Sequence, residues 1–159
     1  MNLSQPERSK SNEYILIINT AINHYLGIAI LKNRAILARN WRSVKYKQSE
    51  KLLTFIDTVL VKNGLKAQDL SALVVVTGPG SFTAVRLGVL AANTWGLVLD
   101  IPVIPFEIKS KKFLDKEDWH LPDWRKLLIK IQNKVEDLDL KDKKFKPVLP
   151  VYEGEANIG

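Results

Sequence analysis

Three short apolar runs near the start of the chain predict β-strands. They are Tyr14 to Ala21, Tyr25 to Leu31 and Arg34 to Trp41. Only a few polar residues separate them, so we expect consecutive strands to pair as an antiparallel meander. Lys32 and Asn33 suit a two-residue turn between the second and third strands.

The next segment, Ser49 to Leu65, has helical periodicity. Ser49 suits the N-cap and Gly64 suits the C-terminal stop. At about 100° per residue its apolar side chains cover roughly 160°, which is wider than contact with one sheet requires. One half of this face is expected to point to the core: Leu53, Ile56 and Leu60. The other half is expected to extend past it: Leu52, Phe55 and Val59.

A second strand and helix follow. Ser71 to Gly78 is apolar throughout, which indicates a strand covered on both faces. A helix is predicted from Ser81 to about Leu99, and Ile101 to Phe106, with two prolines, suits an edge strand. This order of elements predicts an α/β fold with a mixed sheet and flanking helices.

The Ser81 helix is apolar on two opposite sides. A row of small residues recurs every four positions and permits close approach of the sheet: Ala84, Gly88, Ala92 and Gly96. The other flank carries larger residues: Leu87, Leu90, Thr94, Leu97 and Val98. One sheet cannot cover both sides, so spare apolar surface is expected here.

The composition changes after Glu107, where charged residues dominate. One amphipathic helix is predicted from Pro122 or Asp123, because apolar residues recur at helical spacing: Leu127, Leu128, Ile131, Val135 and Leu138. Trp119 and Trp124 are expected to pack this helix onto the sheet rather than to stack on bases. The tail from Pro147 suits a short extended segment.

Composition limits the function classes. The chain has 159 residues and 46% hydrophobic residues, which suits one domain with a real core. Cysteine is absent, so disulfides and thiolate metal sites are excluded. Residues 1–13 are polar and suit a flexible leader, not a signal peptide. The most apolar segment, Phe82 to Phe106, is interrupted by Arg86 and Asp100, so we expect no membrane span.

The net charge of +7 is unevenly distributed. Six basic residues and no acidic ones lie between Lys32 and Lys47. Such a stripe attracts phosphates, but it is equally typical of a solvated strand edge protected from aggregation. The candidate RNA contacts are Arg39, Arg42, Lys45 and Lys47.

The strand–helix junction at Gly78–Ser81 raises two interpretations. A glycine-rich turn that opens a helix can hold a phosphate, but this one lacks the lysine of a Walker motif. The alternative, which we favour, is a tight turn whose glycines bring strand and helix together. His24 and His120 stand alone, and no His, Asp or Glu cluster has metal-ligand spacing, so we expect neither a metal nor a cofactor.

The stretch GPGSFTAVRLG resembles the GPGSFTGxRxG signature of the TsaB family, also called YeaZ, of bacterial tRNA threonylcarbamoyladenosine synthesis. The matching residues are Gly78, Pro79, Gly80, Ser81, Phe82, Thr83, Arg86 and Gly88. The resemblance covers roughly residues 14 to 107, with a faint match to a Pro-x-Tyr motif near the end. It departs at Asn19, where the family has Asp, and at Ala84, where it has Gly.

The resemblance implies one actin-like half of the ASKHA superfamily, with the family's second half reduced. The implied organisation is a leader over 1–13, the actin-like domain over 14–107, and a charged helix and tail over 108–159. It further implies a cytoplasmic, non-catalytic subunit that pairs with the catalytic subunit TsaD and is joined by the ATPase TsaE. A homodimer is expected when the chain is alone.

Pairing in that family is implied to use the two helices of the first half. The expected interface is Leu52, Phe55, Val59, Leu87, Leu90, Thr94 and Leu97. Two other functions stay open: an ATP-using, sugar-kinase-like enzyme fragment and a stand-alone RNA-binding module. Asn19 in place of a carboxylate speaks against the first, and no known RNA motif supports the second.

Overall fold

A five-stranded mixed sheet forms the centre of the computed structural model, which describes residues 12–22, 24–45, 47–109 and 120–151. The strand order is β3-β2-β1-β4-β5. The strands are β1 (Tyr14–Asn19), β2 (Tyr25–Lys32), β3 (Ala35–Ser43), β4 (Ala72–Gly78) and β5 (Val103–Glu107). The first three form the expected antiparallel meander, and β4 and β5 add in parallel to β1.

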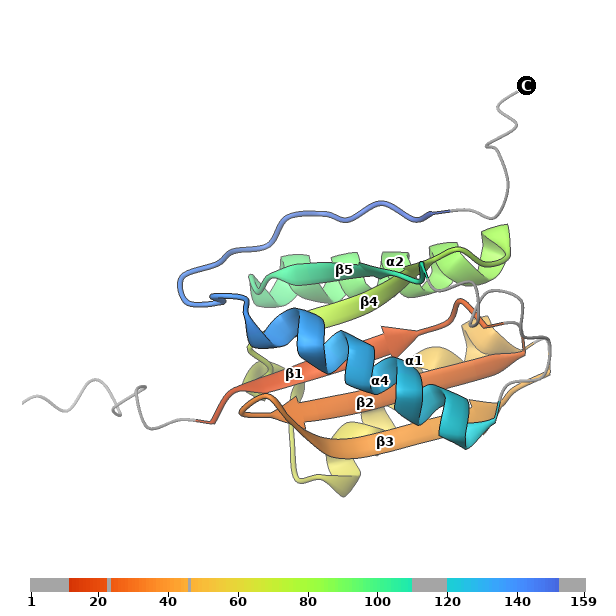
Figure 1. Cartoon of the computed structure of the whole chain (residues 1–159), viewed down its shortest axis with the longest axis horizontal. Coiled ribbons are helices and arrows are strands. Elements are labelled where there is room, and N and C mark those ends of the chain that lie inside the picture. The colour runs from red at the N-terminus through yellow and green to blue at the C-terminus, as the bar shows by residue number, and fades with distance from the viewer. Residues whose placement is uncertain (1–11, 23, 46, 110–119, 152–159) are drawn as a thin grey trace, which may run out of the picture.

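Helices cover both faces of the sheet (Figure 1). They are α1 (Gln48–Lys62), α2 (Phe82–Leu99) and α4 (Leu121–Glu136), with a short 3₁₀ turn η2 (Ala67–Asp69). α1 packs on β2 and α2 on β4, whereas α4 crosses the opposite face over β2 and β3. The expected α/β class with a mixed sheet and flanking helices is therefore confirmed.

The core follows from the apolar runs of the central strands. Every residue of β4 is buried, as are five of the six residues of β1. A strand that is buried on both faces reads as a continuous apolar run, which is why the sequence indicated these two strands clearly.

Two local predictions are wrong, the hairpin turn by one residue and the helix N-cap by two. The hairpin turn consists of Asn33 and Arg34, with φ angles of 51° and 72°, and Lys32 pairs with Ala35. Two consecutive left-handed residues suit the twist of a tight hairpin. α1 begins at Gln48 with no side-chain cap, so Ser49 is not its N-cap. Gln48 instead donates to the carbonyl of Tyr25 at 2.8 Å and fixes the helix start to β2.

The burial of α1 corrects the expected division of its apolar face. The buried residues are Leu52, Phe55, Ile56, Val59 and Leu60. Projected at about 100° per residue they span roughly 140°, and Leu53 lies just outside this arc. Leu52, Phe55 and Val59 therefore face the core, and Leu53 is the exposed residue.

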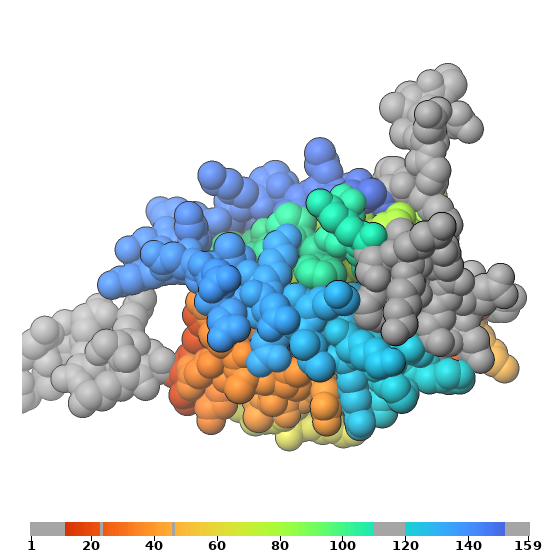
Figure 2. Space-filling model, viewed as in Figure 1, coloured from red at the N-terminus to blue at the C-terminus, as the bar shows by residue number. Residues whose placement is uncertain are grey.

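α4 closes the other face of the sheet through Trp124. This side chain is fully buried and lies with its ring centroid 5.6 Å from that of Trp41. Gly27 of β2 makes room, because a Cβ there would lie 3.0 Å from the Trp124 ring. The expected packing of Trp124 is confirmed, whereas Trp119 lies outside the described residues. Figure 2 shows α4 and the segment after it spread over this side of the molecule.

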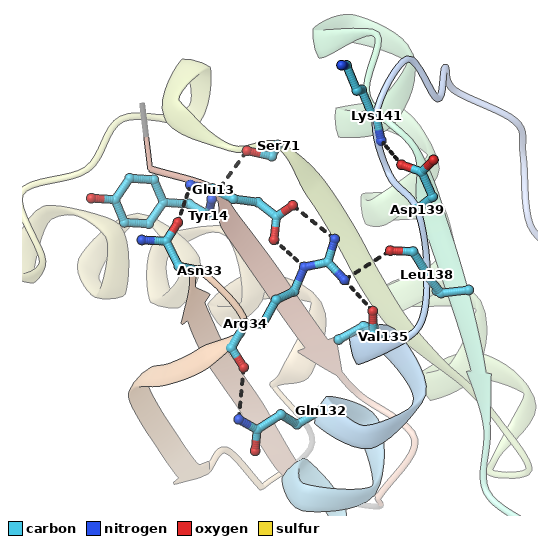
Figure 3. A network of polar contacts seen from close by, with 10 residues as sticks. All are labelled: Glu13, Tyr14, Asn33, Arg34, Ser71, Gln132, Val135, Leu138, Asp139 and Lys141. Atoms are coloured by element: carbon cyan, nitrogen blue, oxygen red, sulfur yellow. Dashed lines mark hydrogen bonds and ion pairs between the residues drawn. The ribbon is translucent and has the colours of Figure 1, made fainter. Parts of the chain in front are cut away.

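Arg34 ties three distant segments together (Figure 3). Its guanidinium forms an ion pair with Glu13 and donates to the carbonyls of Val135 and Leu138 at the end of α4. Its own carbonyl accepts from Gln132 at 2.8 Å. A cation beside the last carbonyls of a helix is favourable because it complements the helix dipole. Glu13 thus belongs to the folded unit, and residues 1–11 lie outside the described residues.

By length and composition, one helix of the described residues, α2, could cross a membrane. Here its buried side rests on the sheet, with Ala84, Gly88, Ala92 and Gly96 all buried.

Candidate functional site

The Gly78–Ser81 turn is packed tightly on both sides. Gly78 has a φ of +117°, and a Cβ there would lie 2.1 Å from the carbonyl oxygen of Val151. A Cβ on Gly80 would lie 2.5 Å from the carbonyl oxygen of Ala21. Both glycines are needed because backbone approaches them closely, which supports the packing interpretation of this turn.

The end of β1 is occupied by structural hydrogen bonds. Asn19 is fully buried, and its Oδ1 accepts the N–H of Ala21 at 3.0 Å. Thr20, also fully buried, donates its hydroxyl to the carbonyl of Ala84 at 2.5 Å. These bonds join the end of β1 to the loop after it and to the first turn of α2.

The start of α2 has the expected cap. The hydroxyl of Ser81 accepts the N–H of Ala84 at 3.3 Å. Phe82, Thr83 and Arg86 are exposed on the first turns, with the Arg86 guanidinium 4.9 Å from the centre of the Phe82 ring. The signature therefore divides into a closely packed turn, of which Gly78 is buried and Pro79 and Gly80 are half-buried, and an exposed helix start.

The small-residue row of α2 brings this helix close to the sheet, as predicted. A Cβ on Gly88 would lie 2.5 Å from Thr20 Oγ1, and one on Gly96 would lie 2.4 Å from Val103. The opposite flank has no cover within the described residues. Leu90 and Leu97 are each 66% exposed and Val98 is 76% exposed.

A shallow apolar groove runs between α1 and α2. It encloses about 230 Å³. Its lining is Ser49, Leu52, Leu53, Leu87, Leu90, Ala91, Thr94 and Trp95. We call this set the α1–α2 groove.

The groove gathers four of the seven expected interface residues: Leu52, Leu87, Leu90 and Thr94. Leu97 is exposed further along α2, whereas Phe55 and Val59 are buried in the core. Sequence reasoning missed Leu53, which is 55% exposed. The width of the apolar face of α1 predicted more apolar surface than the sheet can cover. Which edge of this face stays exposed depends on the orientation in which α1 packs on β2.

A larger hollow adjoins the groove. It encloses about 700 Å³ between the starts of α1 and α2 and the C-terminal segment, and shares Ser49, Leu87 and Leu90 with the groove. The C-terminal segment is fixed here because Asn93 accepts the N–H of Val148 at 2.9 Å and donates to its carbonyl at 3.0 Å. The expected extended tail thus lies against α2 through Val148.

The basic stripe does not form one surface. Successive residues of a strand point to opposite faces, so Arg39 and Arg42 lie on different sides of β3. Arg42 lies on the face of the sheet that is covered by α1, and its guanidinium is 4.5 Å from the centre of the Phe55 ring. Arg42, Lys45 and Lys47 line a common hollow that Arg39 does not reach.

The titratable side chains that line the two hollows are mostly basic: His24 and Arg86 in the larger one, and Arg42, Lys45, Lys47 and Lys51 beside β3. Among the described residues there is no group of three His, Asp or Glu side chains placed to hold a metal. Within the described ranges one pKa is clearly shifted: burial, with a contribution from Lys109, lowers the pKa of Lys134. Lys134 lies on α4 and donates to the carbonyl of Pro105, on the face of the sheet away from the groove.

Several known proteins similar to the chain are named for the synthesis of threonylcarbamoyladenosine in tRNA. Residues 42–107 match the family model of TsaD, tRNA N6-adenosine threonylcarbamoyltransferase. The chain is 39% identical over 89 residues to "tRNA threonylcarbamoyladenosine biosynthesis protein TsaB" of Bacillus subtilis, covering 56% of this chain and 38% of that protein. It is 27% identical over 124 residues to the TsaB of Buchnera aphidicola, covering 78% of this chain and 57% of that protein.

A solved structure shares the fold. YeaZ from Pseudomonas aeruginosa superimposes with a TM-score of 0.56 at 21% identity, covering 60% of this chain and 44% of that one. The chain therefore shares the fold of this YeaZ structure, and the resemblance that the signature indicated is confirmed. The chain spans 38% and 57% of the two TsaB relatives, so it matches only a part of each.

Proposed function

We propose, taking the TsaB/YeaZ family that these similarities support as the premise, that the chain is a non-catalytic scaffold and activator in threonylcarbamoyladenosine synthesis. In this proposal it pairs in the cytoplasm with a TsaD-like catalytic subunit, and a TsaE-like ATPase joins the pair. The name of the relatives supports the pathway. The scaffold role is inferred from the apolar surface that α1 and α2 expose.

The observation that carries the proposal is the α1–α2 groove with its exposed leucines. Leu53 on α1 and Leu90 on α2 both line the groove and are more than half exposed. Leu97 and Val98 continue the apolar surface along α2. Burial of a leucine contributes roughly 1.5–3 kcal/mol, so a few such residues can sustain a stable pair.

The kind of partner follows from the shape of this surface. Two neighbouring helices with an apolar seam are completed by two more helices, which gives a four-helix bundle. A protein with the same fold offers the same helix pair. A TsaD-like subunit fits this requirement because residues 42–107, which include both helices, match the TsaD family model. Self-association through the same surface is expected when the partner is missing.

A scaffold role agrees with the chemistry at the end of β1. An ATP-using enzyme of this fold would need an acidic side chain there, and the position is held by Asn19, whose Oδ1 already caps the Ala21 N–H. The glycines of the turn are packed against the backbone carbonyls of Val151 and Ala21. We therefore favour the scaffold over the ATP-using alternative.

Reconstitution tests this function. The chain, the TsaD-like and TsaE-like subunits of the same organism and unmodified tRNA are combined, and threonylcarbamoyladenosine is quantified in the digested tRNA. The expected result is modification that depends on the chain, with no sustained ATP turnover by the chain alone. Full modification without the chain would contradict the proposal, as would sustained ATP hydrolysis by the pure chain.

A further inference from the structure

A basic hollow lies where β3 ends and α1 begins. It encloses about 440 Å³. It is lined by Arg42, Ser43, Val44, Lys45, Lys47 and Lys51. Lys51, in the first turns of α1, was not among the sequence candidates, because its place beside the others depends on how the loop returns to the helix.

The charge of the hollow comes from four cations: Arg42, Lys45, Lys47 and Lys51. None of them forms an ion pair with a carboxylate in the part of the chain that the structure describes. Arg42 is held in place by its stacking on Phe55, yet it remains exposed. A guanidinium that is oriented by an aromatic ring and open to solvent is prepared to bind a planar or tetrahedral anion.

The placement of the lysines opposes the stability of α1. Lys47 is the N-cap residue of α1 and Lys51 lies four residues further on, so two like charges are neighbours at this helix end. Both lie at the positive end of the helix dipole, where anions are favoured. The N-cap residue, Lys47, forms no side-chain capping hydrogen bond with the described residues. Residues that reduce the stability of a fold are expected where they contribute to binding.

From these observations we propose that the hollow binds backbone phosphates of RNA, with Arg42, Lys45, Lys47 and Lys51 as the contacts. The inference rests on the proposed function in taking tRNA as the RNA. Such contacts position the nucleic acid and carry no direct sequence information. Val44, the apolar residue of the lining, is buried, so the hollow offers no side chain for insertion into a membrane.

The hollow and the α1–α2 groove lie on different sides of α1. Lys51 and Leu53 are two positions apart, which is about 200° around a helix. The groove is lined by residues of α1 and α2, whereas the hollow is lined by residues of β3, the loop and α1. RNA in the hollow therefore leaves the groove open, and one chain can hold a protein partner and RNA together.

Fluorescence anisotropy of a labelled, unmodified tRNA transcript tests this site with the full chain between 50 and 200 mM salt. The site variant is Lys45→Gln, Lys47→Gln, Lys51→Gln. The matched control removes the same charge elsewhere through Arg39→Gln, Lys126→Gln, Lys141→Gln, all at exposed positions. Vesicles rich in phosphatidylserine serve as a second anionic probe.

The expected result is selective loss in the site variant. Each lost phosphate contact lowers the slope of log affinity against log salt concentration by about 0.7–0.9. Loss of three contacts should therefore lower this slope by roughly two units and the affinity for tRNA by at least about tenfold. The control should lose less than about threefold. The thermal midpoint of the site variant should equal or exceed that of the parent, because repulsion in α1 is relieved.

The proposed site would be refuted if the parent showed no saturable tRNA binding at 50 mM salt, or if both variants lost tRNA affinity equally. It would also be refuted if vesicles bound in a lysine-dependent way and tRNA did not bind. Pairing with the TsaD-like subunit is measured on the same variants. Loss of tRNA binding in the site variant with pairing kept supports the site. Binding of tRNA by a chain that fails to pair would refute the proposed scaffold role and leave the site standing.

Discussion

Replacement of Gly88 by alanine tests whether the small-residue row of α2 exists to let the helix approach the sheet. The new Cβ would lie 2.5 Å from Thr20 Oγ1 and 3.2 Å from its Cγ2. Thr20 is fully buried and donates to the carbonyl of Ala84, so it cannot turn away without breaking that bond. The new Cβ therefore pushes α2 away from the sheet, and the Thr20 hydroxyl loses the Ala84 carbonyl as its acceptor.

The size of the effect follows from three terms. Overpacking a core costs about 1–3 kcal/mol. A buried hydroxyl left without a partner adds about 1–3 kcal/mol. Alanine returns about 1 kcal/mol through its higher helix propensity. The net loss in the free energy of unfolding is therefore about 3 kcal/mol, within a range of about 1–5 kcal/mol.

Urea unfolding of four chains measures the coupling: the parent, Gly88→Ala, Thr20→Ala and the double variant. Thr20→Ala removes the two nearest atoms, Oγ1 and Cγ2, and leaves the Cβ of residue 20 at 3.4 Å, which is an ordinary van der Waals contact. In that background Gly88→Ala should be neutral or should stabilise by up to about 1 kcal/mol. Strict additivity of the two single effects would refute the reasoning, because residues that do not touch show no coupling.

Three further predictions concern other parts of the fold. Arg34→Ala should lower the unfolding free energy by about 1–2 kcal/mol, because partly exposed charge-assisted bonds at the end of α4 are lost; chemical denaturation checks this. Leu52→Ala should cost about 2–5 kcal/mol and Leu53→Ala less than about 1 kcal/mol in the same assay, since only the first is buried. Because the pKa of Lys134 is lowered from 10.5, the folded chain binds fewer protons than the unfolded chain between the lowered pKa and pH 10.5. The free energy of unfolding, compared with that of Lys134→Met, should therefore rise with pH across this window.

The parts of the fold that the sequence predicted well are those decided locally. β1 and β4 are continuous apolar runs, and burial on both faces requires such runs. Ser81 caps α2 because the cap depends only on residues within one turn. The small-residue row was also predictable, since its four-residue spacing already placed it on one side of the helix.

The parts that the sequence could not predict depend on tertiary placement. The apolar face of α1 was visible, but its orientation on β2 decided that Leu53 and not Phe55 would be exposed. Arg39 and Arg42 belong to one basic stripe in the sequence, yet strand geometry sends them to opposite faces. Lys51 joins the basic hollow only because the loop after β3 returns to the start of α1.

Pairing with a TsaD-like subunit through the α1–α2 groove is the central claim. Gel filtration of the co-expressed subunits, followed by titration of the purified chains, tests it most directly. The groove variant is Leu53→Glu, Leu90→Glu. The control is Leu37→Glu, Ile129→Glu, which changes two exposed apolar residues on β3 and α4, outside the groove lining.

The parent and the control should co-elute with the partner. Each glutamate in the groove should cost at least roughly 2 kcal/mol of binding, so the groove variant should lose affinity by about three orders of magnitude and elute apart from the partner. A groove variant that keeps the parent's circular dichroism spectrum and still binds the partner with the parent's affinity would contradict the account.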